Sequence, residues 1–384
     1  MTKASLINSK LPRVETTIFT IMSKLANEHN AINLSQGFPD YGCSKELVAL
    51  IHKNMLAGNN QYAPMPGLLS LREAISKKMD CAYGKKHDAE TEITITAGAT
   101  QAIFTAISTI VNPGDEVIIF EPAYDCYAPA IELYGGKVVP ITLQFPNYTI
   151  DWKEVAGLVN TKTRAIIINN PNNPTSGVFD KNDLLQLENI VRNTNIVIIS
   201  DEVYEHLIFD GAQHQSVAAF KGLAERSFIV FSFGKTYHAT GWKIGYCLAP
   251  KELMNEFRKI HQFNVFCVNN PIQQALAEYL NKTEDYLTLP NFFQEKRDFF
   301  VDKLNGSRFT IYPSKGTYFQ LLGYEKISRE NDVAFAERLI KEFKVASIPL
   351  SVFYDKKEDN KVLRFCFAKK NETLLSAAEI LKSI

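Results

Sequence analysis

The chain has 384 residues, of which 46% are apolar and 22% charged, and its 42 basic residues balance its 42 acidic ones. Such a composition is typical of a globular enzyme and excludes disordered and fibrous chains, and the zero net charge argues against nucleic acid or an anionic membrane as a partner. At roughly 100 to 200 residues per domain, the length predicts two domains or three.

The sequence predicts a cytoplasmic protein. Lys10, Arg13 and Lys24 interrupt the short apolar stretches near the start, so the continuous apolar core of a signal peptide is missing. No stretch approaches the roughly 18 apolar residues of a membrane span. The six cysteines form no CxxC pair and no Cys/His spacing suited to a metal, which favours reduced thiols and predicts no metal site.

The first third of the chain is expected to hold a short strand, at residues 31–35, and two helices. Ser44 can cap the first helix, because apolar residues recur at helical spacing between 47 and 55. The second helix is expected from about 68 to 80. The loop between the helices, residues 61–67, is rich in proline and aromatic residues and can reach a partner.

Strands and helices alternate from residue 92 onwards, which predicts a mostly parallel sheet covered by helices. Seven strands are expected, at residues 93–96, 117–120, 137–141, 165–169, 196–200, 227–231 and 244–248. Beyond residue 251 helical patterns dominate, and four short strands then mix with helices, which predicts a smaller α+β domain. These strands are expected at residues 308–311, 318–321, 345–348 and 362–367, and we place the domain boundary near residue 285.

A turn of small residues, from Ala97 through Gly98 and Ala99 to Thr100, joins the first of the seven strands to a helix. The unpaired N–H groups at the start of that helix, together with the Thr100 hydroxyl, can bind an anion such as phosphate without a basic side chain. A tight turn that binds nothing is the alternative, and this stretch alone does not decide between the two.

Polar residues follow three more of the expected strands. Asn173 lies in an Asn/Pro/Gly run after one strand, Asp201 and Tyr204 follow the next, and Lys235 follows a third. Each alone has an ordinary explanation as a turn, a helix cap or a solvated lysine. Parallel strands, however, bring their carboxyl ends to one edge of a sheet, where open α/β proteins bind ligands. The set therefore predicts one site.

These residue types suit one kind of cofactor chemistry. A lysine can form an imine with an aromatic aldehyde, and a carboxylate can keep a pyridine nitrogen protonated so that the ring accepts electrons. Lys235 and Asp201 fit these two roles. Asn173 and Tyr204 can hold a ring oxygen, and Tyr124 offers a flat face for stacking.

In these ordered motifs the sequence resembles the fold-type I pyridoxal-phosphate enzymes, specifically the class I and II aminotransferases and most of all their methionine and kynurenine/glutamine branch. The matching motifs span nearly the whole chain, at residues 35–40, 61–64, 97–100, 170–177, 232–245 and 363–365. The resemblance implies pyridoxal 5'-phosphate as cofactor, an α/β large domain whose mostly parallel seven-stranded sheet is sandwiched by helices, and a homodimer with shared active sites. It also implies an N-terminal segment (1–40) that packs with the small domain, a large domain (41–285) and a small C-terminal α+β domain (286–384).

The resemblance gives each matching residue a role. Lys235 would form the Schiff base and carry the proton, and Asp201 would pair with the pyridine nitrogen. The cofactor would also be held by Gly98, Ala99, Thr100, Tyr124, Asn173, Tyr204, Ser232 and Lys243, with Tyr62 reaching in from the neighbouring subunit. The substrate would be bound by Gly37, Phe38, Tyr124, Asn173 and Arg364, whose guanidinium fork would grip its carboxylate.

Two positions depart from the family pattern. Lys243 stands where an arginine is usual, and it supplies positive charge without the planar fork of a guanidinium. His238 stands where a small residue is usual. We expect a packed histidine rather than a catalytic one, because Lys235 already performs the proton transfer.

The amino donor is expected to be neutral. Relatives that act on dicarboxylates present a second arginine from the segment that is here residues 262–269, and that segment contains none. Phe263, Val265 and Phe266 instead favour an apolar pocket. The expected donors are methionine, aromatic amino acids, kynurenine or glutamine, and the acceptor is a 2-oxo acid.

Three other functions compete with this one. A β-lyase that cleaves cysteine S-conjugates would use the same cofactor site, and the sequence leaves it open. A phosphate-binding nucleotide loop ending at Gly234 and Lys235 needs a glycine five residues before Gly234, where Ile229 stands. A regulatory protein of the same fold would carry a DNA-binding segment, for which the stretch before Ala31 is short and not basic.

Overall fold

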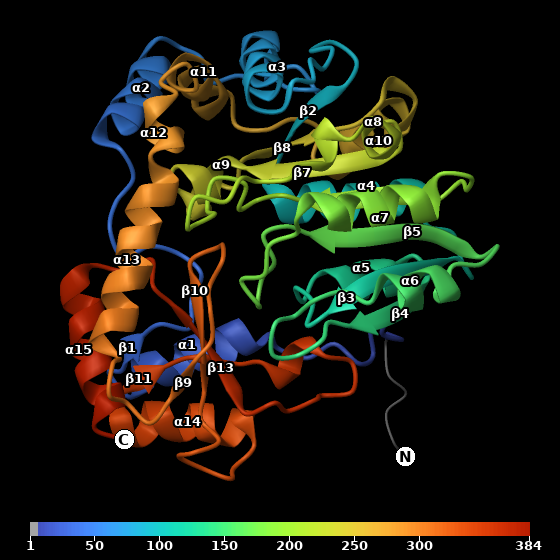
Figure 1. Cartoon of the computed structure of the whole chain (residues 1–384). Helices are drawn as coiled ribbons and strands as arrows, with labels where there is room; N and C mark the ends of the chain where they lie inside the picture. The colour runs from blue at the N-terminus through green and yellow to red at the C-terminus, as the bar shows by residue number, and fades with distance from the viewer. Residues whose placement is uncertain (1–6) are drawn as a thin grey trace, which may run out of the picture.

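The computed structural model of the chain describes residues 7–384, so the first six residues of the expected N-terminal segment lie outside it. Seven of the described strands form the main sheet, in the order β2-β8-β7-β6-β5-β3-β4 (Figure 1). Their bounds are β2 (Ile93–Thr96), β3 (Glu116–Glu121), β4 (Lys137–Thr142), β5 (Thr163–Asn169), β6 (Val197–Asp201), β7 (Ser227–Ser232) and β8 (Gly245–Leu248). β8 runs antiparallel to β2 and β7, and all other neighbours are parallel. The seven expected strands and the mostly parallel sheet are confirmed.

Helices connect the strands and cover the sheet. In chain order they are α1 (Ile18–Glu28), α2 (Lys45–Leu56), α3 (Leu69–Tyr83), α4 (Ala99–Ile110), α5 (Tyr127–Leu133), α6 (Trp152–Leu158), α7 (Lys181–Val191), α8 (Lys221–Ala224), α9 (Phe233–Thr236), α10 (Lys251–Asn264), α11 (Asn270–Tyr279), α12 (Glu284–Leu287), α13 (Leu289–Lys303), α14 (Asp332–Phe343) and α15 (Asn371–Lys382). The Ser44 hydroxyl caps α2 by accepting a bond from the Leu47 N–H, as expected. From residue 7 to the C-terminus, none of these helices is both long and apolar enough to cross a membrane.

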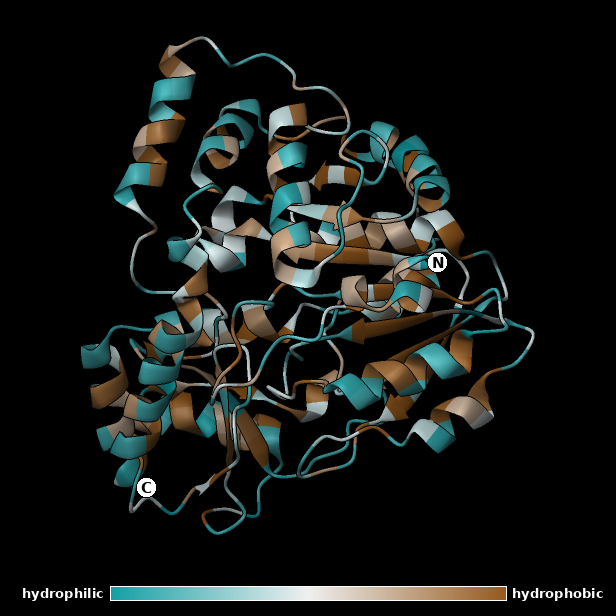
Figure 2. Ribbon diagram, turned by 45° about the horizontal axis from the view of Figure 1, so that its top comes forward, coloured by the Kyte–Doolittle hydropathy of each residue, from teal (hydrophilic) through white to brown (hydrophobic). Residues whose placement is uncertain are grey.

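The main sheet is buried on both faces. Along β5, Ile166 and Ile168 pack into one apolar cluster with residues of α6 and α7, whereas Ala165 and Ile167 pack into a second with α4, α5 and α10. Successive side chains of a strand point to opposite faces, so a strand covered on both sides must be apolar throughout. Figure 2 shows the strands largely in the brown of hydrophobic residues, while the helices around them alternate brown and teal.

A second sheet lies in the C-terminal part, with four antiparallel strands in the order β12-β13-β10-β9. They are β9 (Thr310–Ile311), β10 (Phe319–Gly323), β12 (Ile348–Pro349) and β13 (Val362–Cys366). The expectation of one strand at 345–348 is wrong, because the chain changes partner at Ser347. β11 (Val345–Ala346) pairs in parallel with β1 (Ile32–Asn33), and β12 pairs with β13. The domain boundaries at residues 40 and 285 stay predictions.

The structure contains a helix, α1, that the sequence did not predict. The Thr17 hydroxyl caps it by accepting a bond from the Thr20 N–H, and Met22 and Ala26 are its buried residues. In Figure 1 the blue α1 and β1 lie beside α14 and β11 from the other end of the chain. A short helix of this kind is stabilised mainly by tertiary packing, which a local sequence pattern does not reveal.

Candidate active site

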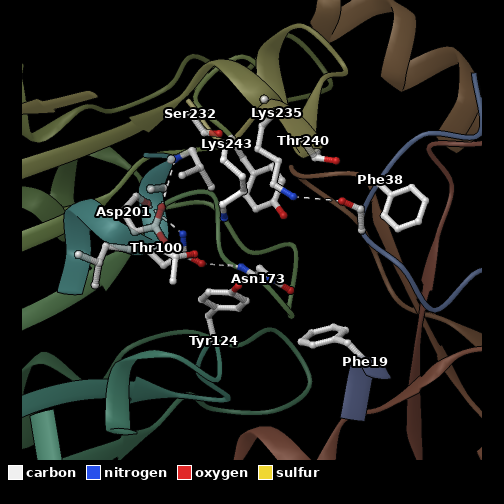
Figure 3. Close-up of a pocket in the computed structure, with 18 of the residues that line it drawn as sticks. Phe19, Phe38, Thr100, Tyr124, Asn173, Asp201, Ser232, Lys235, Thr240 and Lys243 are labelled. Carbon is white, nitrogen blue, oxygen red and sulfur yellow. Dashed lines mark hydrogen bonds between the residues drawn. The ribbon is translucent and has the colours of Figure 1, made fainter. Parts of the chain in front are cut away.

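A cavity of about 300 Å³ lies at the carboxyl ends of β5, β6 and β7 (Figure 3). The last residues of these strands, Asn169, Asp201 and Ser232, all line it. Of the residues predicted to bind cofactor or substrate, all but Tyr62 line this cavity: Gly37, Phe38, Gly98, Ala99, Thr100, Tyr124, Asn173, Asp201, Tyr204, Ser232, Lys235, Lys243 and Arg364. Motifs that are far apart in the sequence thus meet at one edge of the sheet.

Lys235 lies in α9, which follows directly on β7. Its amine donates hydrogen bonds to the Tyr318 hydroxyl at 2.9 Å and to the Gly37 carbonyl at 3.1 Å, and Figure 3 shows the second of these bonds. Burial lowers the pKa of the amine to about 8, and the nearby charges of Arg364 and Lys243 act in the same direction. A lowered pKa increases the share of neutral amine, which is the form that attacks an aldehyde.

Asp201 ends β6 with its carboxylate buried in the sheet. One carboxylate oxygen accepts a hydrogen bond from the Tyr127 hydroxyl at 2.7 Å, and the other accepts one from the Val203 N–H at 3.3 Å. Burial raises the pKa of the carboxyl to about 6, although these hydrogen bonds and Lys235 oppose the rise. No cation of the described chain forms an ion pair with it, so a protonated ring nitrogen would supply the missing charge.

The start of α4 is built to receive an anion. No side chain caps its first turn, and the residue before it, Gly98, has a φ of 78°. The Lys243 amine lies beside this turn, since a Cβ added to Gly98 would be 3.6 Å from its nitrogen. Gly245 in β8 allows the close approach, because a Cβ there would lie 3.3 Å from the Ala99 nitrogen and 2.5 Å from the Phe231 carbonyl oxygen. Free N–H groups, a cation and the Thr100 and Ser232 hydroxyls have the chemistry to hold a phosphate.

Arg364 is a buried cation in β13. Its two terminal nitrogens donate to the Asn173 side-chain oxygen at 2.6 Å and to the Ser35 carbonyl at 2.9 Å, while its Nε is buried without a partner. The guanidinium stacks over Phe319 at 3.9 Å and lies 5.2 Å from the ring centre of Phe19. A buried cation with an unused donor and no carboxylate bonded to it is suited to a ligand carboxylate.

Asn173 and Tyr204, the two residues predicted to hold a ring oxygen, both line the cavity. The Asn173 main-chain N–H donates to the Asn169 side-chain oxygen at 2.7 Å, which holds the loop against the end of β5. Because Arg364 uses the Asn173 amide oxygen, only the amide NH₂ is left to hold a ring oxygen. The Tyr204 ring is 2% exposed and stands edge-on to Tyr318, with 5.2 Å between ring centres.

Tyr62, predicted to reach across a subunit boundary, lies outside this cavity, and so do Phe263 and Phe266, which were expected to form the apolar substrate pocket. The Tyr62 side chain is 82% exposed and meets Phe266 edge-on, with 5.3 Å between ring centres. Phe263 is 86% exposed. Phe266 is 46% exposed, so the Tyr62–Phe266 pair presents apolar surface to solvent. None of the three contributes to the cavity of its own chain.

His238 is packed among aromatic rings and is not among the residues that line the cavity. Its ring meets Tyr41 edge-on at 5.3 Å and Phe293 at 5.6 Å between ring centres. Burial lowers the pKa of the imidazole to about 4, with Lys296 acting in the same direction. The environment fits the packed interpretation, because an imidazole that stays neutral and faces no ligand has no proton to exchange there.

The sequence did not single out several residues of the site. The additional lining residues are Phe19, Gln36, Ile103, Asn169, Val203, Gly234, Thr240, Ile244 and Phe319. Most of them adjoin a motif residue and would follow from extending each motif. Phe19 is different, because it comes from the unpredicted α1. Tyr318 and Tyr127 were also missed, since their hydrogen bonds to Lys235 and Asp201 join segments distant in sequence.

The chain is similar to known proteins over its whole length. Residues 29–381 match the family of class I and II aminotransferases. A methionine aminotransferase from Escherichia coli is 50% identical over 386 residues, which cover 100% of both chains. The solved structure of N-succinyldiaminopimelate aminotransferase from Mycobacterium tuberculosis superposes with a TM-score of 0.94 at 36% identity, covering 98% of this chain and 99% of that one. Kynurenine–oxoglutarate transaminase 1 of Homo sapiens is 31% identical over 395 residues, 94% of this chain and 93% of its own.

Replacing the buried carboxyl should change stability in a pH-dependent way. Asp201→Asn is expected to stabilise the cofactor-free protein at pH 8 by roughly 1 to 3 kcal/mol, because burial raises the pKa of the wild-type carboxyl to about 6. The folded wild type binds more protons than the unfolded chain between pH 4 and pH 6, so its stability falls as the pH rises through this window. The amide does not ionise and escapes that loss.

Urea unfolding of the two cofactor-free proteins at pH 5 and pH 8 measures this effect. The advantage of the variant should grow from pH 5 to pH 8. If the variant were more stable than the wild type by the same amount at both pH values, this would contradict a raised pKa of the Asp201 carboxyl. The same substitution should weaken the binding of pyridoxal phosphate, because the ring nitrogen loses its anionic partner.

Proposed function

Because the chain belongs to the class I and II aminotransferases, which use pyridoxal phosphate, we propose that its amino donor is a neutral, apolar or aromatic L-amino acid of the methionine type and its acceptor a 2-oxo acid. The observation that carries the proposal is the distribution of cations in the cavity. Among the residues that line it, Lys235, Lys243 and Arg364 are the only cations. Only one of them, Arg364, is free to bind a carboxylate of the substrate.

The cofactor and the chain divide the chemistry between them. When bound, pyridoxal phosphate supplies an aldehyde that captures the amino group and a ring that accepts the electron pair left at the α-carbon. Asp201 would keep a proton on the ring nitrogen, and Lys243 with the start of α4 would bind the phosphate. Asn173 and Tyr204 would hold the ring oxygen. Tyr124 would cover one face of the ring.

Lys235 would perform the proton transfer. Its Nζ would take the proton from the α-carbon of the substrate and deliver it to the carbon that was the aldehyde. The lowered pKa of about 8 suits this exchange, because an amine that titrates near the working pH both accepts and releases a proton readily. Burial of the amine keeps water from competing for that proton.

The wall beyond Arg364 favours an apolar substrate side chain. Phe19 and Phe38 both line the cavity, and Phe19 lies against the guanidinium itself. A side-chain carboxylate would enter an aromatic environment with no second arginine to pair with, and burying an unpaired charge costs several kcal/mol. An apolar side chain gains contact there instead. The 50% identity to a methionine aminotransferase supports methionine as the first donor to test.

We infer that the working form is a homodimer in which each chain completes the site of the other. The support is the exposed pair of Tyr62 and Phe266, together with exposed Phe263, none of which lines the cavity of its own chain. In the dimer Tyr62 would bind the phosphate of the partner's site, and the two phenylalanines would close its substrate end. A cytoplasmic location is part of the same proposal, supported by six cysteines that are all free thiols.

Steady-state assays against a panel of amino acids test the proposed donor. The kcat/KM for methionine should exceed that for aspartate by roughly 100-fold or more, because the second carboxylate has no cation to pair with. Phe19→Ala should lower kcat/KM for methionine more than for alanine, whose methyl group makes little contact with the ring. A preference for aspartate over methionine would overturn the proposal.

A matched assay separates the two reactions that this site can support. The same preparations are incubated with a cysteine S-conjugate, and the release of pyruvate and thiol is compared with amino transfer to a 2-oxo acid. We expect transfer to dominate. Release that exceeds transfer would make the protein a β-lyase instead.

Mixing two inactive variants tests whether the sites are shared. Lys235→Ala and Tyr62→Ala are unfolded together and refolded, so that chains exchange between dimers. If Tyr62 acts across the interface, each mixed dimer has one intact site, and about a quarter of the wild-type activity should return because half of the dimers are mixed. No recovery would show that Tyr62 serves its own chain or no site at all. Refolding each variant alone is the control.

A further inference from the structure

Three distant segments of the chain meet at the amine of Lys235. The lysine comes from α9 after the main sheet, Gly37 from the loop after β1, and Tyr318 from the residue before β10 of the second sheet. The Lys235 amine donates to the Tyr318 hydroxyl at 2.9 Å and to the Gly37 carbonyl at 3.1 Å. The Tyr318 hydroxyl in turn donates to the same carbonyl. The three groups form a closed set of hydrogen bonds.

The tetrahedral geometry of the amine nitrogen determines where the lone pair of Lys235 points. A neutral amine has two N–H bonds and one lone pair at the corners of a tetrahedron, and both of its N–H bonds are used by Tyr318 and Gly37. The remaining corner therefore carries the lone pair. We infer that this corner faces the cavity, which Lys235 and Gly37 line and Tyr318 does not. The lone pair is the part of the amine that takes up a proton.

Tyr318 is held in the orientation that this arrangement requires. Its ring is 1% exposed and packs edge-on against Tyr204 at 5.2 Å and against Phe319 at 5.0 Å, with Phe293 at 5.8 Å on another side. Burial raises the pKa of its hydroxyl well above the usual value, so the hydroxyl keeps its proton. Since that proton goes to the Gly37 carbonyl, the oxygen acts as an acceptor towards Lys235, and the Tyr204 side chain is its other hydrogen-bonding neighbour.

We propose that Tyr318 is a further catalytic residue, whose hydroxyl holds the free amine of Lys235 with its lone pair turned towards the substrate. This rests on the role of Lys235 proposed above. In the transfer, Nζ would take one proton from the α-carbon and become an ammonium, and the electron pair of the broken C–H bond would stay with the carbon, from which the cofactor ring can accept it. Return of that proton to the carbon that was the aldehyde would restore the neutral amine. Tyr318 stays neutral throughout.

Other groups near the amine do not replace this contact. Asp201 and Cys366 raise its pKa through their charge and Arg364 and Lys243 lower it, but none of the four is hydrogen-bonded to Nζ. These four groups therefore influence whether the amine is charged, but they do not orient its N–H bonds or its lone pair. Tyr318 and the Gly37 carbonyl are the groups that direct it, and only Tyr318 acts through a side chain.

Tyr318→Phe removes the hydroxyl and keeps the packed ring. Tyr324→Phe is the matched control, because Tyr324 lies just beyond the other end of β10, is fully buried, and donates its hydroxyl to the Glu330 carbonyl at 2.9 Å. Each variant loses one buried hydroxyl bonded to a main-chain carbonyl. Thermal unfolding of the cofactor-free proteins shows how much stability each substitution costs, and the two costs should be similar.

The first readout does not depend on turnover. The rate at which pyridoxal phosphate adds to the cofactor-free protein is measured against pH, since only the neutral amine adds. The midpoint of this profile should fall by roughly 1 unit in Tyr318→Phe, because the ammonium form loses a hydrogen-bond acceptor that stabilises it more than the neutral form. Tyr324→Phe should keep the wild-type midpoint.

The second readout is the proton transfer itself. Single-turnover reactions with methionine and with methionine deuterated at the α-carbon are compared. Tyr318→Phe should slow this step roughly 10- to 100-fold and increase the deuterium isotope effect, because a misdirected amine makes proton transfer more fully rate-limiting. Tyr324→Phe should change neither value.

The possible results are distinct. A Tyr318→Phe variant with an unchanged pH midpoint and isotope effect would overturn the proposal, and so would equal losses of rate in Tyr318→Phe and Tyr324→Phe. A wild-type protein that binds pyridoxal phosphate but does not transfer the amino group of methionine would contradict the proposed donor and not the role of Tyr318, which is then measured with the donor that the panel identifies.

Discussion

The site depends on an imbalance of charge. Lys235, Lys243 and Arg364 line one cavity, and Asp201 is the only carboxylate among the residues that line it. Arg364 is fully buried, and burying a cation without a matching anion is unfavourable unless a ligand brings the missing charge. A phosphate at the start of α4 and a carboxylate at Arg364 would restore the balance. The lowered pKa of Lys235 is a further consequence, since burial and its positive neighbours both disfavour the ammonium form.

The sheet makes this imbalance possible. Parallel strands are buried on both faces and stabilised by apolar packing, so polar groups can be concentrated at the carboxyl edge without weakening the core. Asp201 and Ser232 are placed there because they end β6 and β7. The remaining groups come from elsewhere. Gly37 arrives from the N-terminal segment and Arg364 from the second sheet, so the cavity is complete only when the distant parts of the chain have packed together.

Much of this site could be predicted from the sequence, for physical reasons that also explain the misses. Apolar runs that end in a polar residue mark buried parallel strands, which is why Asp201 and Lys235 were found. The Phe19 ring acts through its contact with Arg364, and the Tyr318 hydroxyl acts through its hydrogen bond with Lys235. Both contacts join segments that are far apart in the sequence, so no local pattern encodes them. The run 345–348 looks like a single strand in the sequence, yet β11 and β12 belong to different sheets because their partners differ. Packing across the chain decides such details.

Every role proposed for the site requires Lys235 to be the amine that bonds to the cofactor, and covalent trapping tests this most directly. The protein is incubated with pyridoxal phosphate, reduced with sodium borohydride, digested and mapped by mass spectrometry. We expect a phosphopyridoxyl group on the peptide that contains Lys235, and its loss from that peptide in Lys235→Ala. A label that falls mainly on other lysines, and to the same extent in the variant, would contradict it.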